Sequence, residues 1–166
     1  GLIVLCPYPE GPRSFRTAST SLCVIGLLTS PLKEDPAVKA SLDKALQYLL
    51  TTLPTLKRGD TRTVLGVWGH AYGLSALSRA ARNLPADAPL REELKKVASL
   101  QVKALDQMAD VQGGWGYYTF ETFSKRPIGE PTSFLTATVL LAYKDAEQAF
   151  GLKAEPRIVK RAVASL

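Results

Sequence analysis

The sequence predicts an all-α protein built as a two-layer helical repeat. Three uncharged stretches, residues 17–32, 63–78 and 132–143, alternate with charged amphipathic stretches that begin near Asp35, Leu90 and Pro156. The uncharged stretches are too long for ordinary strands, and they are too short and too polar to span a bilayer. A regular alternation of buried and amphipathic helices is typical of a repeat in which one row of helices covers another.

The first hairpin is expected over residues 15–53, after an irregular N-terminal segment at residues 1–14. Ser30-Pro31 ends its uncharged helix, and Asp35-Pro36 combines a good N-cap with a proline suited to the first helical position. The apolar residues that follow repeat with helical spacing. They are Val38, Leu42, Ala45, Leu46, Leu49 and Leu53.

The second and third hairpins are expected over residues 63–110 and 132–166, separated by a loop at residues 111–131. Pro89 opens the second amphipathic helix, and Gly151 ends the third uncharged one. The apolar positions of the second amphipathic helix are Leu90, Leu94, Val97, Leu105 and Met108. We expect the uncharged helices to be buried nearly all round.

An arc of three hairpins has two open flanks, each exposing the apolar side of a buried helix. Terminal repeats normally carry a polar cap, and the sequence shows none. We therefore expect further repeats of a longer parent protein, or another protein chain, to cover these flanks. The chain opens on a short apolar run without Met and ends inside a helical pattern, so we expect it to be a fragment of a longer protein.

Composition excludes several classes of protein. The 166 residues carry 21 Lys and Arg against 15 Asp and Glu, and the basic residues are scattered rather than gathered in a stripe, so we expect no nucleic-acid partner. No transmembrane segment is expected. The two cysteines exclude a disulfide scaffold. We expect Cys23 to be a small buried hydrophobe, while its pairing with Cys6 and the compartment of the protein stay open.

One motif carries a family resemblance. Gln107, Gly113 and Trp115 form the pattern Q-x5-G-x-W, within the turn Gly113-Gly114-Trp115-Gly116. The pattern resembles the QW repeat of squalene–hopene cyclases, and the glycine-rich turn is similar to one in protein prenyltransferase β subunits. The resemblance implies an α/α toroid, in which inner and outer helices alternate around a cavity. This chain would supply an incomplete ring.

The motif has a structural logic. Glycines permit a tight turn at a helix end. Trp115 can stack on a neighbouring hairpin, and Gln107 can bond free backbone groups at helix ends. The catalytic signatures of the superfamily are absent from the sequence, namely the Asp-x-Asp-Asp motif of the cyclases, the zinc ligands of the prenyltransferases and the Cys-Gly-Glu-Gln of the thioester proteins. No cofactor or metal is expected, and whether the chain is catalytic stays open.

His70 is the one histidine, and it is the first candidate for catalysis. A general base needs a carboxylate partner, for which Asp60 and Glu121 are conceivable. The alternative is a buried histidine that is hydrogen-bonded and packed on aromatic rings.

Aromatic residues supply the candidate ligand-binding surface, because their faces suit isoprenoid or sugar ligands. The candidates are Trp68, Tyr72, Trp115, Tyr117 and Tyr118. The alternative is that these rings only pack between hairpins.

Three functions remain open from the sequence. The first is binding of an apolar, isoprenoid-like ligand on the concave face of the inner helices. The second is a non-enzymatic scaffold for protein interaction. The third is a carbohydrate-active α/α barrel, which would need two acids at the cavity, with Glu121 and Asp60 as the pair. Convergence of His70, Tyr72, Trp115 and an acid on one cavity would favour a ligand site, and their separation would favour a structural arc.

Overall fold

A computed structural model describes residues 10–56, 66–116 and 131–166 of the chain. Within these ranges the structure holds α-helices, one short 3-10 helix and no strand, which confirms the all-α prediction. Five residues singled out in the sequence lie outside the described ranges. They are Cys6, Asp60, Tyr117, Tyr118 and Glu121.

The helices follow one another in three pairs. Their bounds are α1 Glu10–Thr29, α2 Pro36–Thr52, η1 Leu53–Thr55, α3 Gly66–Arg82, α4 Pro89–Met108, α5 Ser133–Phe150 and α6 Pro156–Ala164. The predicted end signals are confirmed. Asp35 caps α2 by accepting a hydrogen bond from the Ala37 N–H at 2.7 Å. Gly151 ends α5 in the left-handed conformation, at φ 69°.

One boundary differs from the expectation. Helix α1 begins at Glu10, so residues 10–14 are helical rather than part of an irregular segment. Pro12 did not prevent this, because a proline is tolerated in the first turn of a helix, where its missing N–H has no intrahelical partner.

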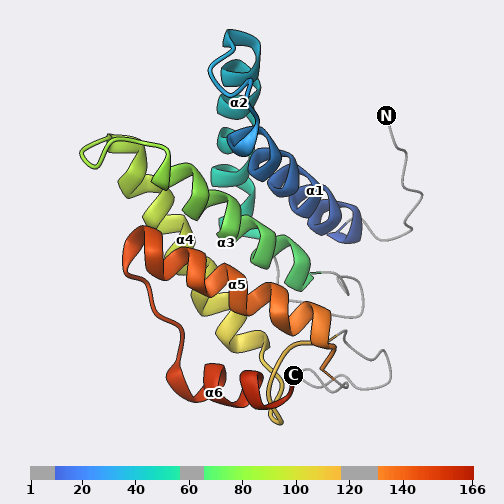
Figure 1. Ribbon diagram of the computed structural model, residues 1–166. Helices are drawn as coiled ribbons and strands as arrows, with labels where there is room; N and C mark the ends of the chain where they lie inside the picture. The colour runs from blue at the N-terminus through green and yellow to red at the C-terminus, as the bar shows by residue number, and fades with distance from the viewer. Residues whose placement is uncertain (1–9, 57–65, 117–130) are drawn as a thin grey trace.

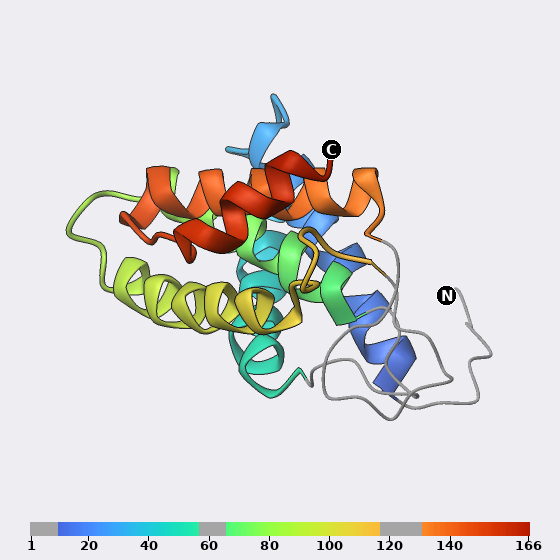
Figure 2. The same ribbon diagram turned by 90° about the horizontal axis from the view of Figure 1, so that it is seen from below.

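Helices α1, α3 and α5 lie side by side as an inner row, with α4 packed against α3 and α5 from the second layer (Figures 1 and 2). The amphipathic helices α2 and α4 turn their predicted apolar stripes to the core. The fully or nearly fully buried positions of these stripes are Leu42, Leu46, Leu49, Leu94, Val97, Leu105 and Met108.

Only the central inner helix is buried nearly all round. In α3 most residues are buried, whereas α1 exposes Phe15 and Leu22, and α5 exposes Phe134 and Leu141. Cys23 of α1 is exposed as well, so its prediction as a buried hydrophobe is wrong. The reason is that α3 has an inner helix on each side, whereas α1 and α5 each have an inner helix on one side only.

Small side chains bring α1 and α3 close together. The buried face of α1 carries Ser14, Thr17 and Ser21. A Cβ atom on Gly69 of α3 would lie 3.3 Å from the Ser14 carbonyl oxygen and 2.7 Å from Leu56 Cδ2. Thr17 and Ser21 each donate their hydroxyl to a backbone carbonyl one turn earlier, at 2.8 Å, so burial leaves these two hydroxyls satisfied.

Charged side chains join α3 to α5. Asp145 of α5 is buried, and its carboxylate accepts hydrogen bonds from Arg79 Nε at 3.0 Å and from Arg82 Nη2 at 2.9 Å. From the first turn of α4, Arg91 donates to the carbonyl oxygens of Ala81 and Ala149, the latter at 2.7 Å. These carbonyls lie at the C-terminal ends of α3 and α5, where a cation is favoured by the helix dipole.

Candidate functional site

The glycine turn after α4 is built around a buried tryptophan. Trp115 is fully buried, donates its indole N–H to the Leu105 carbonyl at 2.9 Å, and packs edge-on against Tyr143 with ring centroids 5.7 Å apart. Gly113 and Gly114 adopt φ values of 116° and 78°, which other residues rarely reach. The backbone N–H of Trp115 donates to Thr136 Oγ1 of α5 at 3.1 Å. The turn therefore joins α4 to α5.

Asp110, rather than Gln107, closes this turn. Gln107 is exposed on α4, and within the described part of the chain it makes no hydrogen bond to the turn. The carboxylate of Asp110 accepts from the Gln112 N–H at 2.7 Å, and the Asp110 N–H donates to the Gly114 carbonyl at 2.9 Å. The role expected for Gln107 is thus corrected. The sequence signal for Asp110 was an Asp three residues before the glycine pair of the turn, a position from which its side chain can bond the backbone two residues on.

His70 is locked between two helices. Its side chain is buried at the α3–α4 contact, and Nδ1 lies 2.6 Å from the amide oxygen of Gln101. The Gln101 amide nitrogen donates to the Val97 carbonyl, which fixes the amide orientation. Because an amide oxygen only accepts, Nδ1 of His70 carries the proton. This geometry corresponds to the hydrogen-bonded structural alternative for His70.

Gln101 was missed in the sequence, although a signal was present. It falls at the helical spacing of the stripe formed by Leu94, Val97, Leu105 and Met108. A polar residue at an otherwise apolar position of such a stripe requires a buried partner. On the neighbouring uncharged helix the side chain that fills this need is His70.

Aromatic rings stack on the side of α3 that lies opposite His70, and they continue onto α5. Trp68 and Tyr72 each lie two residues from His70, so they project from the side of α3 that faces away from α4. Trp68 stacks with Tyr72 at 5.3 Å and with Phe134 of α5 at 5.8 Å between ring centroids. Leu141 lies two turns after Phe134 on the same face of α5 and is 61% exposed. We name these four residues the aromatic strip.

The candidate residues that the structure describes therefore lie in three places. His70 points into the α3–α4 contact, Trp115 is enclosed between α4 and α5, and the pair Trp68–Tyr72 lies on the aromatic strip. They do not converge on one cavity. Of the ligand-binding candidates within the described ranges, Trp68 and Tyr72 are partly exposed, whereas Trp115 is fully buried.

A second polar contact crosses the far side of α5. Tyr143 donates its hydroxyl to Asp106 of α4 at 2.8 Å. Partial burial raises the pKa of Asp106, and the hydrogen bond from Tyr143 offsets only part of that effect. Burial raises the pKa of Tyr143 above its ordinary value, so the phenol stays protonated and remains the donor.

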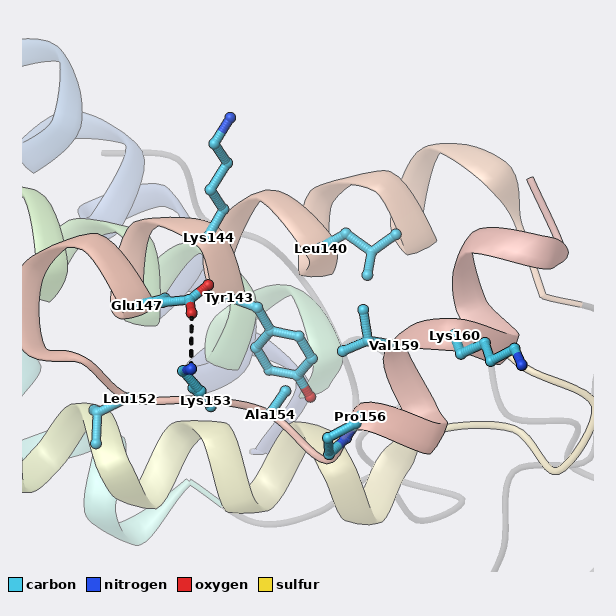
Figure 3. Close-up of a pocket in the computed structure, with 10 residues that line it drawn as sticks. All are labelled: Leu140, Tyr143, Lys144, Glu147, Leu152, Lys153, Ala154, Pro156, Val159 and Lys160. Carbon is cyan, nitrogen blue, oxygen red and sulfur yellow. Dashed lines mark ion pairs between the residues drawn. The ribbon is translucent and has the colours of Figure 1, made fainter.

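Hollows lie on both sides of the segment 152–156, which connects α5 to α6. One, of about 420 Å³, lies between α5 and α6, and Tyr143 forms part of its wall (Figure 3). The other, of about 410 Å³, includes Asp106 in its lining. In the first hollow Glu147 and Lys153 pair with each other across 3.7 Å.

The described residues include neither a metal-ligating cluster nor a membrane-spanning helix. In these ranges, no group of three or more His, Cys, Asp or Glu residues could hold a metal ion. The helices described also include none whose length and apolar character would suffice to cross a membrane. Comparison with known proteins gave no matching family model, no matching curated protein and no matching solved structure.

Proposed function

We propose that the chain is an arc of an α/α toroid of the squalene–hopene cyclase and protein prenyltransferase type, which binds a neutral isoprenoid-like chain along the aromatic strip. The observation that carries the proposal is the strip itself: Tyr72, Trp68 and Phe134 stack across two inner helices on the side away from α4.

The helix arrangement supports the toroid part of this proposal. Inner helices from three successive pairs lie side by side, and each is followed in the chain by an amphipathic helix (Figure 1). The turn that carries the family resemblance holds Trp115 in the core and joins one pair to the next. In a toroid, the side of the inner row away from the outer layer faces the cavity.

The chemistry of the strip supports an apolar ligand. Phe134 is 54% exposed and Leu141 is 61% exposed, and neighbouring exposed apolar groups on one face often mark a binding surface. Dispersion and apolar burial would hold such a ligand along the strip. His70 lies on the opposite side of α3, buried at the contact with α4, so it does not face a ligand on the aromatic strip.

Titration of the protein with farnesol tests the proposal. We expect saturable binding, measured by calorimetry, and a loss of affinity of about 5–10-fold for Trp68→Ala and for Phe134→Ala, the effect of removing one aromatic contact. Leu32→Ala is the matched control, because Leu32 is equally apolar and 64% exposed but lies in the turn after α1. Absence of saturable binding, or equal affinity in Trp68→Ala and wild type, would refute the proposal.

A second candidate, the non-enzymatic interaction scaffold, is favoured by one observation: α1 exposes Phe15 and Leu22. Substitutions distinguish the two candidate functions, because each function depends on different residues. Ligand binding depends on Trp68 and Phe134, whereas protein association depends on the exposed side of α1. The acid pair required by the carbohydrate alternative, Asp60 and Glu121, lies outside the described residues.

A further inference from the structure

The side of α3 that carries the aromatic strip also carries a cation at its far end. Arg79 lies nine residues after His70, which at 100° per residue places it on the opposite side of the helix, between the directions of Trp68 and Tyr72. Tyr72 and Arg79 are seven residues apart, so two helical turns separate them on one face. The strip therefore leads along α3 from aromatic rings to a guanidinium group.

Helix α5 follows the same path. Leu141, the last residue of the strip on this helix, is 61% exposed, and Asp145 lies one turn after it. Asp145 is the residue to which Arg79 is bound. On both helices the apolar surface thus borders the same charged cluster, which consists of Arg79, Arg82 and Asp145.

This cluster has one more positive charge than negative. Arg79 Nε and Arg82 Nη2 bind different oxygens of Asp145, at 3.0 and 2.9 Å, so one carboxylate serves two guanidinium groups. Arg82 also donates through Nη1 to Gln148 at 2.7 Å. The two terminal nitrogens of Arg79 have no such protein partner in the part of the chain that the structure describes, and the side chain is 37% exposed. They are donors available to a ligand.

The charge and shape of this end match one kind of ligand head. A planar guanidinium binds a carboxylate through paired hydrogen bonds, which are stronger than bonds to a neutral group. A single negative charge would balance the excess charge of the cluster, and Arg82 offsets the repulsion from Asp145. The rise from Trp68 to Arg79 is about 16 Å at 1.5 Å per residue. An apolar path of this length beside a cation is complementary to a chain with an anionic end.

We propose that the ligand of the aromatic strip is an apolar chain that ends in a carboxylate, with the chain along the strip and the carboxylate bound by the terminal nitrogens of Arg79. This inference rests on the proposed function, which concerns the chain alone, and it adds the chemistry of the head and the direction of binding. The head lies at the C-terminal end of α3. The tail points toward Phe134, at the N-terminal end of α5.

Two ligands with the same chain test the proposal, namely farnesol and farnesoic acid. By calorimetry at neutral pH, we expect farnesoate to bind at least about tenfold more tightly than farnesol, because the charged head gains charge-assisted hydrogen bonds. Arg79→Gln should lower the affinity for farnesoate to that for farnesol. The affinity for farnesol should stay as in wild type, because Arg79 lies outside the aromatic strip.

Two further variants serve as controls. Lys103→Gln removes one positive charge from the exposed surface of α4, in the outer layer, and should keep the preference for farnesoate. Arg79→Lys keeps the charge without the planar fork, so it should retain only part of the preference. Circular dichroism checks that each variant folds. Should Arg79→Gln fail to fold, the partial loss in Arg79→Lys carries the test.

Three outcomes would overturn the proposal. These are equal affinity of wild type for the two ligands, a full preference for farnesoate in both Arg79 variants, and an equal loss of preference in Lys103→Gln. The first outcome, with saturable binding of farnesol, would refute the carboxylate head and leave the proposed function intact. Absence of binding by either ligand would refute the proposed function itself. Farnesoate binding that Trp68→Ala does not weaken would refute the strip as the site of the chain, and this inference with it.

Discussion

The inner row holds its helices together in two different ways. Between α1 and α3 the contact depends on small side chains: Gly69 meets the backbone of Ser14, and no ion pair joins the two helices in the part of the chain that the structure describes. Between α3 and α5 the contact depends on long side chains, with Asp145 bound to two arginines and Phe134 stacked on Trp68. Neighbouring repeats of one fold can thus be joined by steric fit or by specific polar bonds.

The largest effect is expected where steric fit is disturbed. Gly69→Leu should lower the free energy of unfolding by about 3 kcal/mol or more, because even a Cβ atom would overlap Leu56 and press on the Ser14 backbone. Urea unfolding measures the change. Gly26→Ala is the matched control on the neighbouring helix, and it should stabilise by about 0.5–1 kcal/mol because its Cβ has open space and alanine favours helix. Equal effects at the two glycines would contradict the steric account of the α1–α3 contact.

At the α3–α5 contact, stability should depend on a charged group, whereas at the α1–α3 contact it depends on steric fit. Asp145→Ala removes the acceptor of Arg79 and Arg82, and we expect a loss of about 2 kcal/mol in urea unfolding, moderated by the partial exposure of both guanidinium groups. The matched control is Glu147→Gln on the same helix, whose exposed pair with Lys153 should contribute only a few tenths of a kcal/mol. A similar loss of unfolding free energy in both variants would show that the Asp145 interactions stabilise the protein no more than an exposed ion pair does.

The turn between α4 and α5 gives a smaller contrast. Asp110→Ala removes the carboxylate that accepts from the Gln112 N–H, and it should cost about 1 kcal/mol in thermal or urea unfolding. Gln107→Ala should change stability little, because the Gln107 side chain is exposed and makes no hydrogen bond to the turn among the described residues. The reverse order of effects would restore the closing role to Gln107.

The smallest effect concerns pH. The pKa of Asp106 is raised in the folded protein, so the folded state binds its proton more tightly than the unfolded state does. The stability that protonated Asp106 contributes is therefore fully present at pH values below 3.8, the ordinary pKa of the group. It is lost as the pH rises through the raised pKa of the folded protein. Asp106→Asn should flatten the dependence of stability on pH just above that value. An unchanged slope in the variant would show that another group titrates there.

The sequence predicted the order of helices and their ends because those depend on local chemistry. Asp35 and Pro36 start a helix, and Gly151 ends one, whatever surrounds them. Burial round α1 was predicted wrongly, because an uncharged helix with one inner neighbour and one with two have the same composition. Cys23 is exposed for this reason.

The candidate site could be predicted only in part. The aromatic character of Trp68 and Tyr72 was visible in the sequence, but their stacking with Phe134 depends on how α5 lies against α3. His70 attracted attention as the one histidine, although its partner Gln101 lies on another helix and holds it in the core. Which side of a buried helix a residue faces is set by the neighbouring helices, and a single uncharged stretch does not reveal it.

Arg91 fixes the C-terminal ends of two inner helices, α3 and α5, relative to each other. One guanidinium group, carried by the outer layer, holds the last carbonyls of α3 and α5 together. At the opposite ends of the same two helices the contact is the stacking of Trp68 on Phe134, which tolerates sliding better than a forked hydrogen bond does. Because hydrogen bonds are more directional than ring stacking, we expect a small shift of α5 against α3 to change the spacing of the rings before it breaks the contacts of Arg91.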